Sequence, residues 1–172
     1  MAIEVREQAD VQSQARGMTE WVSLYQTYNA IFKVAELALL PHNLSLPQLH
    51  LLTVLKRGGG MLTNGEIGRE MVKASQTITG LVDRLETEGF VERRFDRRDR
   101  RKTWVRLTAK GERKWEEAMP VANRLAEEIS SVLTDRELKQ LQTNIEKLRA
   151  IAMQDLARAL VGWLPGATAT LA

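Results

Sequence analysis

Apolar positions recur at helical spacing in the first quarter of the chain, and they predict one amphipathic helix from Thr19 to about Leu39. The positions are Trp21, Leu24, Tyr28, Ile31 and Ala35. Pro41 follows, and because a proline disfavours helical backbone at the residue before it, the helix is expected to end there. Residues 1–18 are polar with mixed charge, so they are expected to form an N-terminal extension.

Three helix starts share one local signature: a Ser or Thr cap, a Gln or Glu three residues later, and a pair of apolar residues that staples the first turn. The pairs are Ser45 with Gln48, Thr63 with Glu66, and Thr134 with Glu137. They predict helices over 46–57, 64–71 and 135–160. Glycines 58–60 lack the G-K-[ST] continuation of a phosphate-binding loop, so we interpret them as a turn.

A further helix is predicted to begin near Ser75, which can cap it, and to end at Gly89. One face is apolar and carries Ile78, Leu81, Val82 and Leu85. The other face is small and polar and carries Gln76, Thr77, Thr79, Gly80 and Asp83. Alternating residues at 91–95 and 104–107 then predict two strands, hence a β-hairpin with a long loop.

The last third of the chain is predicted to be helical. Thr108 can cap a helix that runs to about Ser131, and Pro120 is expected to kink or break it. The helix over 135–160 carries an apolar stripe at heptad spacing, which requires a facing helix. Residues 163–172 are expected to be a fraying tail.

Positive charge is concentrated in the predicted hairpin. From Arg93 to Lys114 there are eleven basic and three acidic residues, a sum of +8 in a chain whose net charge is +3. Such a cluster is the electrostatic footprint of a polyanion, although a solvated charged hairpin is the alternative. The chain has no cysteine, which excludes disulfides and thiol chemistry. Without an apolar leader or a long apolar segment, a cytoplasmic location is expected.

The order helix, helix, helix, hairpin is that of a winged helix-turn-helix. In this fold the helix after the turn enters the major groove, where Ser75, Gln76, Thr77 and Thr79 are short enough to contact base edges. Arg69 and Lys73 are expected to meet phosphates beside it. The hairpin loop would lie over the minor groove, with Arg100 as the inserted side chain and Asp99 holding Arg101 in place. The full set expected in the loop is Arg97, Arg98, Asp99, Arg100, Arg101 and Lys102.

Two segments carry a family resemblance: TITGLVDRLETEGFVERR at 77–94 and DRRDRRKTWVRLTAKG at 96–111. They resemble the signature of the MarR family of bacterial transcription regulators. The resemblance implies a mainly α fold with a small β-hairpin wing, divided into a dimerisation helix (19–44), a winged helix-turn-helix DNA-binding domain (45–108) and C-terminal dimerisation helices (109–162). It also implies a homodimer on double-stranded DNA at a pseudo-palindromic operator, released by a small aromatic or amphipathic anion. Arg97 and Gly80 depart from the family pattern, which often has proline and a basic residue there.

Candidate effector-binding residues are Trp21, Tyr25, Tyr28, His42 and His50. An aromatic stripe at helical spacing is more often part of a core or a dimer seam than of a ligand pocket, and isolated histidines are more often structural. No cofactor or metal site is expected, and the scattered carboxylates do not indicate an enzyme. The alternatives to a ligand-responsive repressor are a winged-helix module for protein interaction and an activator without a small-molecule ligand.

Overall fold

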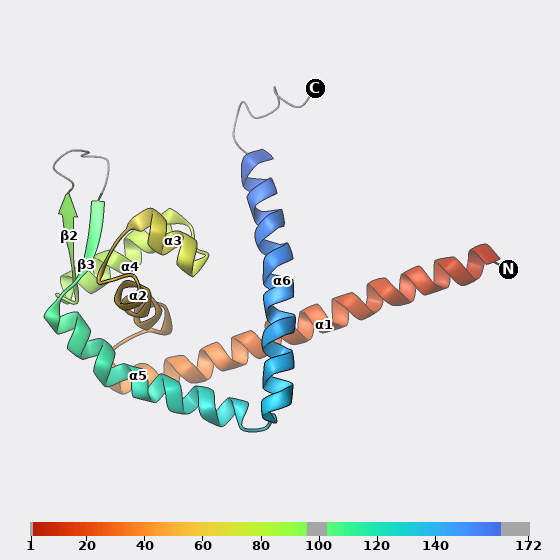
Figure 1. Cartoon of the computed structure of the whole chain (residues 1–172), viewed down its shortest axis with the longest axis horizontal. Coiled ribbons are helices and arrows are strands. Elements are labelled where there is room, and N and C mark those ends of the chain that lie inside the picture. The colour runs from red at the N-terminus through yellow and green to blue at the C-terminus, as the bar shows by residue number, and fades with distance from the viewer. Residues whose placement is uncertain (1, 96–102, 163–172) are drawn as a thin grey trace. The chain divides into compact units, whose positions relative to one another are not determined.

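The computed structural model describes the backbone of residues 2–95 and 103–162 and the side chains of 17–95 and 103–159. Its elements along the chain are α1 (Ala2–Leu39), a 3-10 turn η1 (Leu40–His42), α2 (Leu46–Arg57), β1 (Met61–Thr63), α3 (Asn64–Met71), α4 (Ser75–Thr87), β2 (Val91–Phe95), β3 (Thr103–Leu107), α5 (Ala109–Ser130) and α6 (Asp135–Gly162) (Figure 1). The chain divides into two compact units between Leu125 and Ala126. The predicted fold class, mainly helical with a small β-hairpin, is confirmed.

One apolar core holds the first unit together. It gathers the buried faces of α2, α3 and α4 with the end of α1, the bases of β2 and β3, and Ala118 of α5. Leu51, Leu52, Leu55 and Ile67 are completely buried there. The amphipathic patterns of the sequence therefore meet in a single cluster, which fixes α4 against α2 and α3.

The sheet contains a strand that the sequence analysis missed. β1 pairs antiparallel with β3, with Leu62 opposite Val105, and β3 pairs with β2, with Arg93 opposite Val105 on its other side. The glycine turn makes this possible, because Gly59 and Gly60 take φ values of 79° and 86° and reverse the chain from α2 into β1. A strand of three residues is too short to show a period in the sequence.

The three predicted capping boxes are confirmed. In α2 and α3 the cap hydroxyl accepts from the third helical N–H while the Gln48 or Glu66 side chain accepts from the cap N–H. In α6 the Thr134 N–H donates to Glu137 at 2.8 Å. Thr108 also caps as predicted, accepting from the Gly111 N–H at 3.0 Å.

In the flanking regions one predicted helix start was wrong, and one helix has the predicted extent without the break that was offered as an alternative to a kink. The helix expected from Thr19 begins at Ala2, because residues 2–16 are rich in good helix formers but lack an apolar period that would reveal them. Pro120 does not break α5, which continues to Ser130. Packing of Trp115, Ala118 and Met119 on the core offsets the roughly 3 kcal/mol that an interior proline costs.

Candidate nucleic-acid interface

Helix α4 has one buried face and one exposed face, as predicted. The buried side chains are Ile78, Leu81, Val82 and Leu85. Ser75, Gln76, Thr77 and Thr79 are all exposed. The structure thus brings these four together on the first turns of one helix, where short hydrogen-bonding side chains suit the donors and acceptors of a major groove.

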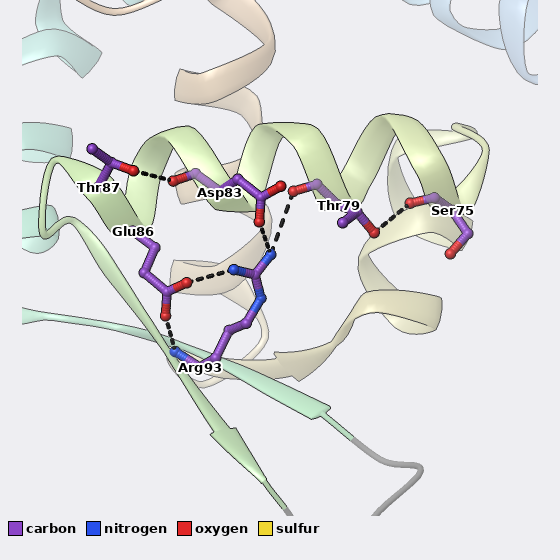
Figure 2. Close-up of polar contacts among 6 residues, drawn as sticks. All are labelled: Ser75, Thr79, Asp83, Glu86, Thr87 and Arg93. Carbon is purple, nitrogen blue, oxygen red and sulfur yellow. Dashed lines mark hydrogen bonds and ion pairs between the residues drawn. The ribbon is translucent and has the colours of Figure 1, made fainter.

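Ser75 does not cap α4, and this prediction was wrong. The N-cap is Ala74, which has no side-chain hydrogen bond, and Ser75 is the first helical residue. The Ser75 carbonyl oxygen accepts a hydrogen bond from the Thr79 hydroxyl at 3.0 Å (Figure 2). The chain enters the helix one residue earlier than the serine signal indicates, within the usual uncertainty of a helix boundary.

Arg69 and Lys73 lie beside the start of α4. Arg69 is in the last turn of α3, and Lys73 lies in the turn between the helices, where its N–H donates to the Gly68 carbonyl at 3.0 Å. Both side chains are exposed. Two exposed cations therefore precede α4 closely in the chain, and their contact with phosphates stays a prediction.

After α4 the chain turns back into β2, and Arg93 of this strand reaches toward the middle of the helix (Figure 2). β2 and β3 pair from Val91 with Leu107 to Phe95 with Thr103. The predicted loop contacts Arg97, Arg98, Asp99, Arg100, Arg101 and Lys102 lie outside the described residues. What the structure describes is the pair of strands that carries this loop.

Basic side chains on the strands are already paired with carboxylates of the same unit. Arg94 and Arg106 both donate to Glu92, at 2.8 Å and 2.5 Å. These hydrogen bonds, with Arg94 the larger contributor, lower the pKa of the Glu92 carboxyl. These arginines belong to the cationic cluster counted in the sequence, so the positive charge that the strands offer to a polyanion is smaller than that count implies.

Arg93 reaches from β2 to α4 (Figure 2). Its guanidinium pairs with Asp83 and with Glu86, and its backbone N–H donates to Glu86 Oε1 at 2.8 Å. Burial acts to lower the pKa of Arg93, but the hydrogen bonds to Asp83 and Glu86 outweigh it and raise the pKa above its ordinary value. Sequence reasoning missed this group because its members lie seven and ten residues apart, beyond any helical or strand period.

The candidate effector residues do not enclose a site in the described structure. Trp21, Tyr25 and Tyr28 are 65%, 62% and 55% exposed on α1. His42 is half-buried in η1, whereas His50 lies on the exposed side of α2. Partial burial, followed by the nearby charges of Lys73 and Arg57, lowers the pKa of His50. An effector site formed by these residues stays a prediction.

No helix in the part of the chain that the structure describes has both the length and the apolar character needed to cross a membrane. Across the same residues, no group of three or more His, Asp or Glu side chains is arranged to hold a metal ion.

Comparison with known proteins matches residues 42–102 to a model of the MarR family. The chain is 34% identical over 96 residues to the transcriptional activatory protein BadR of Rhodopseudomonas palustris, covering 54% of each chain. It is 31% identical over 108 residues to the HTH-type transcriptional repressor MdtR of Bacillus subtilis, covering 63% of this chain and 69% of the relative. The chain thus spans about half the length of BadR and two thirds of MdtR.

Solved structures share the fold at lower identity. The organohalide-sensing RdhR regulator in its 2,4-dichlorophenol-bound form superposes with a TM-score of 0.73 at 23% identity, covering 78% of this chain and 79% of that one. A MarR mutant from E. coli complexed with operator DNA gives a TM-score of 0.68 at 23% identity, covering 73% of this chain and 89% of that one.

Proposed function

Since the chain belongs to the MarR family of winged-helix transcription regulators, we propose that it acts as a homodimer on a pseudo-palindromic operator in the cytoplasm. The observation that carries the proposal is the exposed face of α4, where Gln76, Thr77 and Thr79 project from a helix held by an apolar core. A helix of this kind can lie in a major groove while Arg69 and Lys73 meet the flanking phosphates. We propose that Arg100 in the wing loop enters the adjacent minor groove.

A second copy of the chain is supported by the apolar side chains that each unit leaves exposed. On α1 these include Trp21, Tyr25 and Leu37, and on α6 Leu148 and Ile151, both about 60% exposed. Apolar surface of this extent on a lone chain favours an interface. Light scattering at micromolar concentration should give the mass of two chains, and a monomer would contradict the proposal.

The test of DNA recognition is selection from a random duplex library. The wild type should enrich a two-fold symmetric motif with half-sites roughly 10 bp apart or slightly more, because a symmetric dimer presents both α4 helices to one face of the duplex. Gln76→Ala and Thr77→Ala should each change the preferred base at one position in each half-site. If both variants select the wild-type motif, α4 is not the recognition helix.

We further propose that a small aromatic or amphipathic anion weakens operator binding from a site near Trp21, Tyr25, Tyr28, His42 and His50. The support is the RdhR regulator, whose structure is in a 2,4-dichlorophenol-bound form, and the aromatic side chains of α1. Titration of the operator complex with 2,4-dichlorophenol or salicylate should release DNA in the wild type and less in Tyr25→Ala. Release that is equal in both would place the effector elsewhere.

Repression and activation share the same DNA contact and differ in where the operator lies. The relatives include one named as an activator and one named as a repressor. We propose a repressor, and a reporter driven from the selected operator tests it: expression should rise when the protein is removed. A fall in expression would favour the activator.

A further inference from the structure

Arg93 ties the wing to the recognition helix at one point. It is two residues before Phe95, where β2 ends, and its side chain is 21% exposed. The guanidinium contacts Asp83 and Glu86 and comes within 3.4 Å of the Thr79 carbonyl oxygen, and the Arg93 N–H adds a bond to Glu86. A single strand residue therefore holds two successive turns of α4.

The net charge of this cluster does not favour binding of a phosphate. One guanidinium faces the two carboxylates of Asp83 and Glu86, so the three side chains sum to −1. A phosphate that approached Arg93 would have to displace carboxylates already hydrogen-bonded to it, and it would meet their negative charge. Arg93 is thus unlike Lys73, whose exposed ammonium lies in the turn beside α4.

Such a cluster can fix the orientation of the wing relative to α4. The Arg fork with two carboxylates has a fixed planar geometry, which a flexible lysine cannot reproduce. The helix residue Thr79, whose carbonyl oxygen lies next to Arg93, belongs to the face proposed to read bases. A wing held at one angle to α4 can enter the minor groove while α4 occupies the major groove, without the entropy loss of ordering the two on binding.

We propose that Arg93 is a positioning residue: with Asp83 and Glu86 it fixes the wing relative to α4, and it makes no contact to DNA itself. The inference rests on the proposed DNA-binding function. If the surface bound DNA through positive charge alone, neutralising all three side chains would tighten binding, because the protein becomes more positive. A positioning role predicts the opposite, namely weaker binding.

The test uses the full chain and the duplex selected by the wild type. In the triple variant Arg93→Met, Asp83→Asn, Glu86→Gln, the net charge of each subunit rises by one. We expect the affinity for the selected duplex to fall by about 10-fold or more and the affinity for an unrelated duplex to change little. The slope of log affinity against log salt concentration, called the salt slope below, should stay the same, because only a lost phosphate contact would flatten it, by about 0.9 for each contact. Arg93→Lys should resemble the triple variant, because it keeps the charge but loses the fork.

Lys73→Gln is the matched control for a phosphate contact. It should weaken specific and unrelated duplexes alike and flatten the slope by about two per dimer. Thermal unfolding of each variant establishes that binding is measured on folded protein. Tighter binding by the triple variant, or a flatter slope in Arg93→Lys, would overturn the inference. If the wild type itself selects no duplex, that result contradicts the proposed DNA-binding function rather than the role of Arg93.

Discussion

Val72 takes a backbone conformation that β-branched residues rarely adopt. It is the C-cap of α3, at φ 51° and ψ 48°, in the turn that leads to α4. Left-handed backbone at such a residue costs on the order of 1–3 kcal/mol, whereas glycine occupies this region freely. The side chain is 45% exposed, so little apolar burial offsets the strain.

Val72→Gly is therefore expected to stabilise the protein, by about 1 kcal/mol once the greater freedom of glycine in the unfolded chain is subtracted. Urea unfolding measures the change. Val132→Gly is the matched control, because Val132 is also exposed but has no positive φ, and that substitution should be neutral or destabilising. Equal effects of the two substitutions would show that Val72 is not strained.

His50 gives a pH dependence whose sign follows from its surroundings. Partial burial and the charges of Lys73 and Arg57 lower the pKa of its imidazole below the unfolded value of 6.5. As pH falls below about 6.5, the unfolded chain takes up this proton more readily than the folded chain, so the free energy of unfolding decreases. His50→Gln should remove this part of the pH dependence, seen as a smaller drop in melting temperature between pH 7.5 and pH 5.5. A drop as large as that of the wild type would assign the effect to other groups.

At the scale of elements, the sequence predicted what depends on neighbours along the chain. Capping boxes and apolar periods located α2, α3, α4 and the hairpin to within about a residue, because both signals are complete within one or two turns. β1 was missed because three residues are too short to show a period and because its pairing partner β3 lies far away in the sequence. The Arg93 cluster escaped for the same reason, since it forms only after β2 folds back on α4.

The capping box of α3 carries a measurable share of stability. The Thr63 hydroxyl accepts from the Glu66 N–H at 3.3 Å, and the Thr63 N–H donates to Glu66 Oε2 at 2.7 Å. Thr63→Ala should lower the free energy of unfolding by about 1 kcal/mol, and Thr63→Ser should restore most of it. Thr87→Ala is the control, since that exposed hydroxyl donates only to the Asp83 carbonyl four residues earlier. If both alanine variants lower the free energy of unfolding in urea equally, the capping box does not specifically stabilise the start of α3.

At the scale of the whole molecule, the proposed DNA-reading helix belongs to a chain whose exposed apolar surfaces we propose that a second copy covers. Among the residues whose side chains are described, α1 and α6 leave apolar side chains exposed, and α4 leaves polar ones. A symmetric dimer would present two copies of the short helix α4, and its interface would hold the two helices at a fixed separation. Specificity then depends on both half-sites being present at that spacing.

The measurement that tests this account most directly is an equilibrium titration of the protein with three duplexes: the selected two-fold site, the same site with one half scrambled, and a fully scrambled duplex. At near-physiological salt the two-fold site should be preferred over the scrambled duplex by about 1,000-fold or more, with the single half-site far closer to the scrambled duplex. Affinity for all three should fall as salt rises. Equal affinity for the three duplexes would contradict the claim that this protein recognises an operator as a dimer.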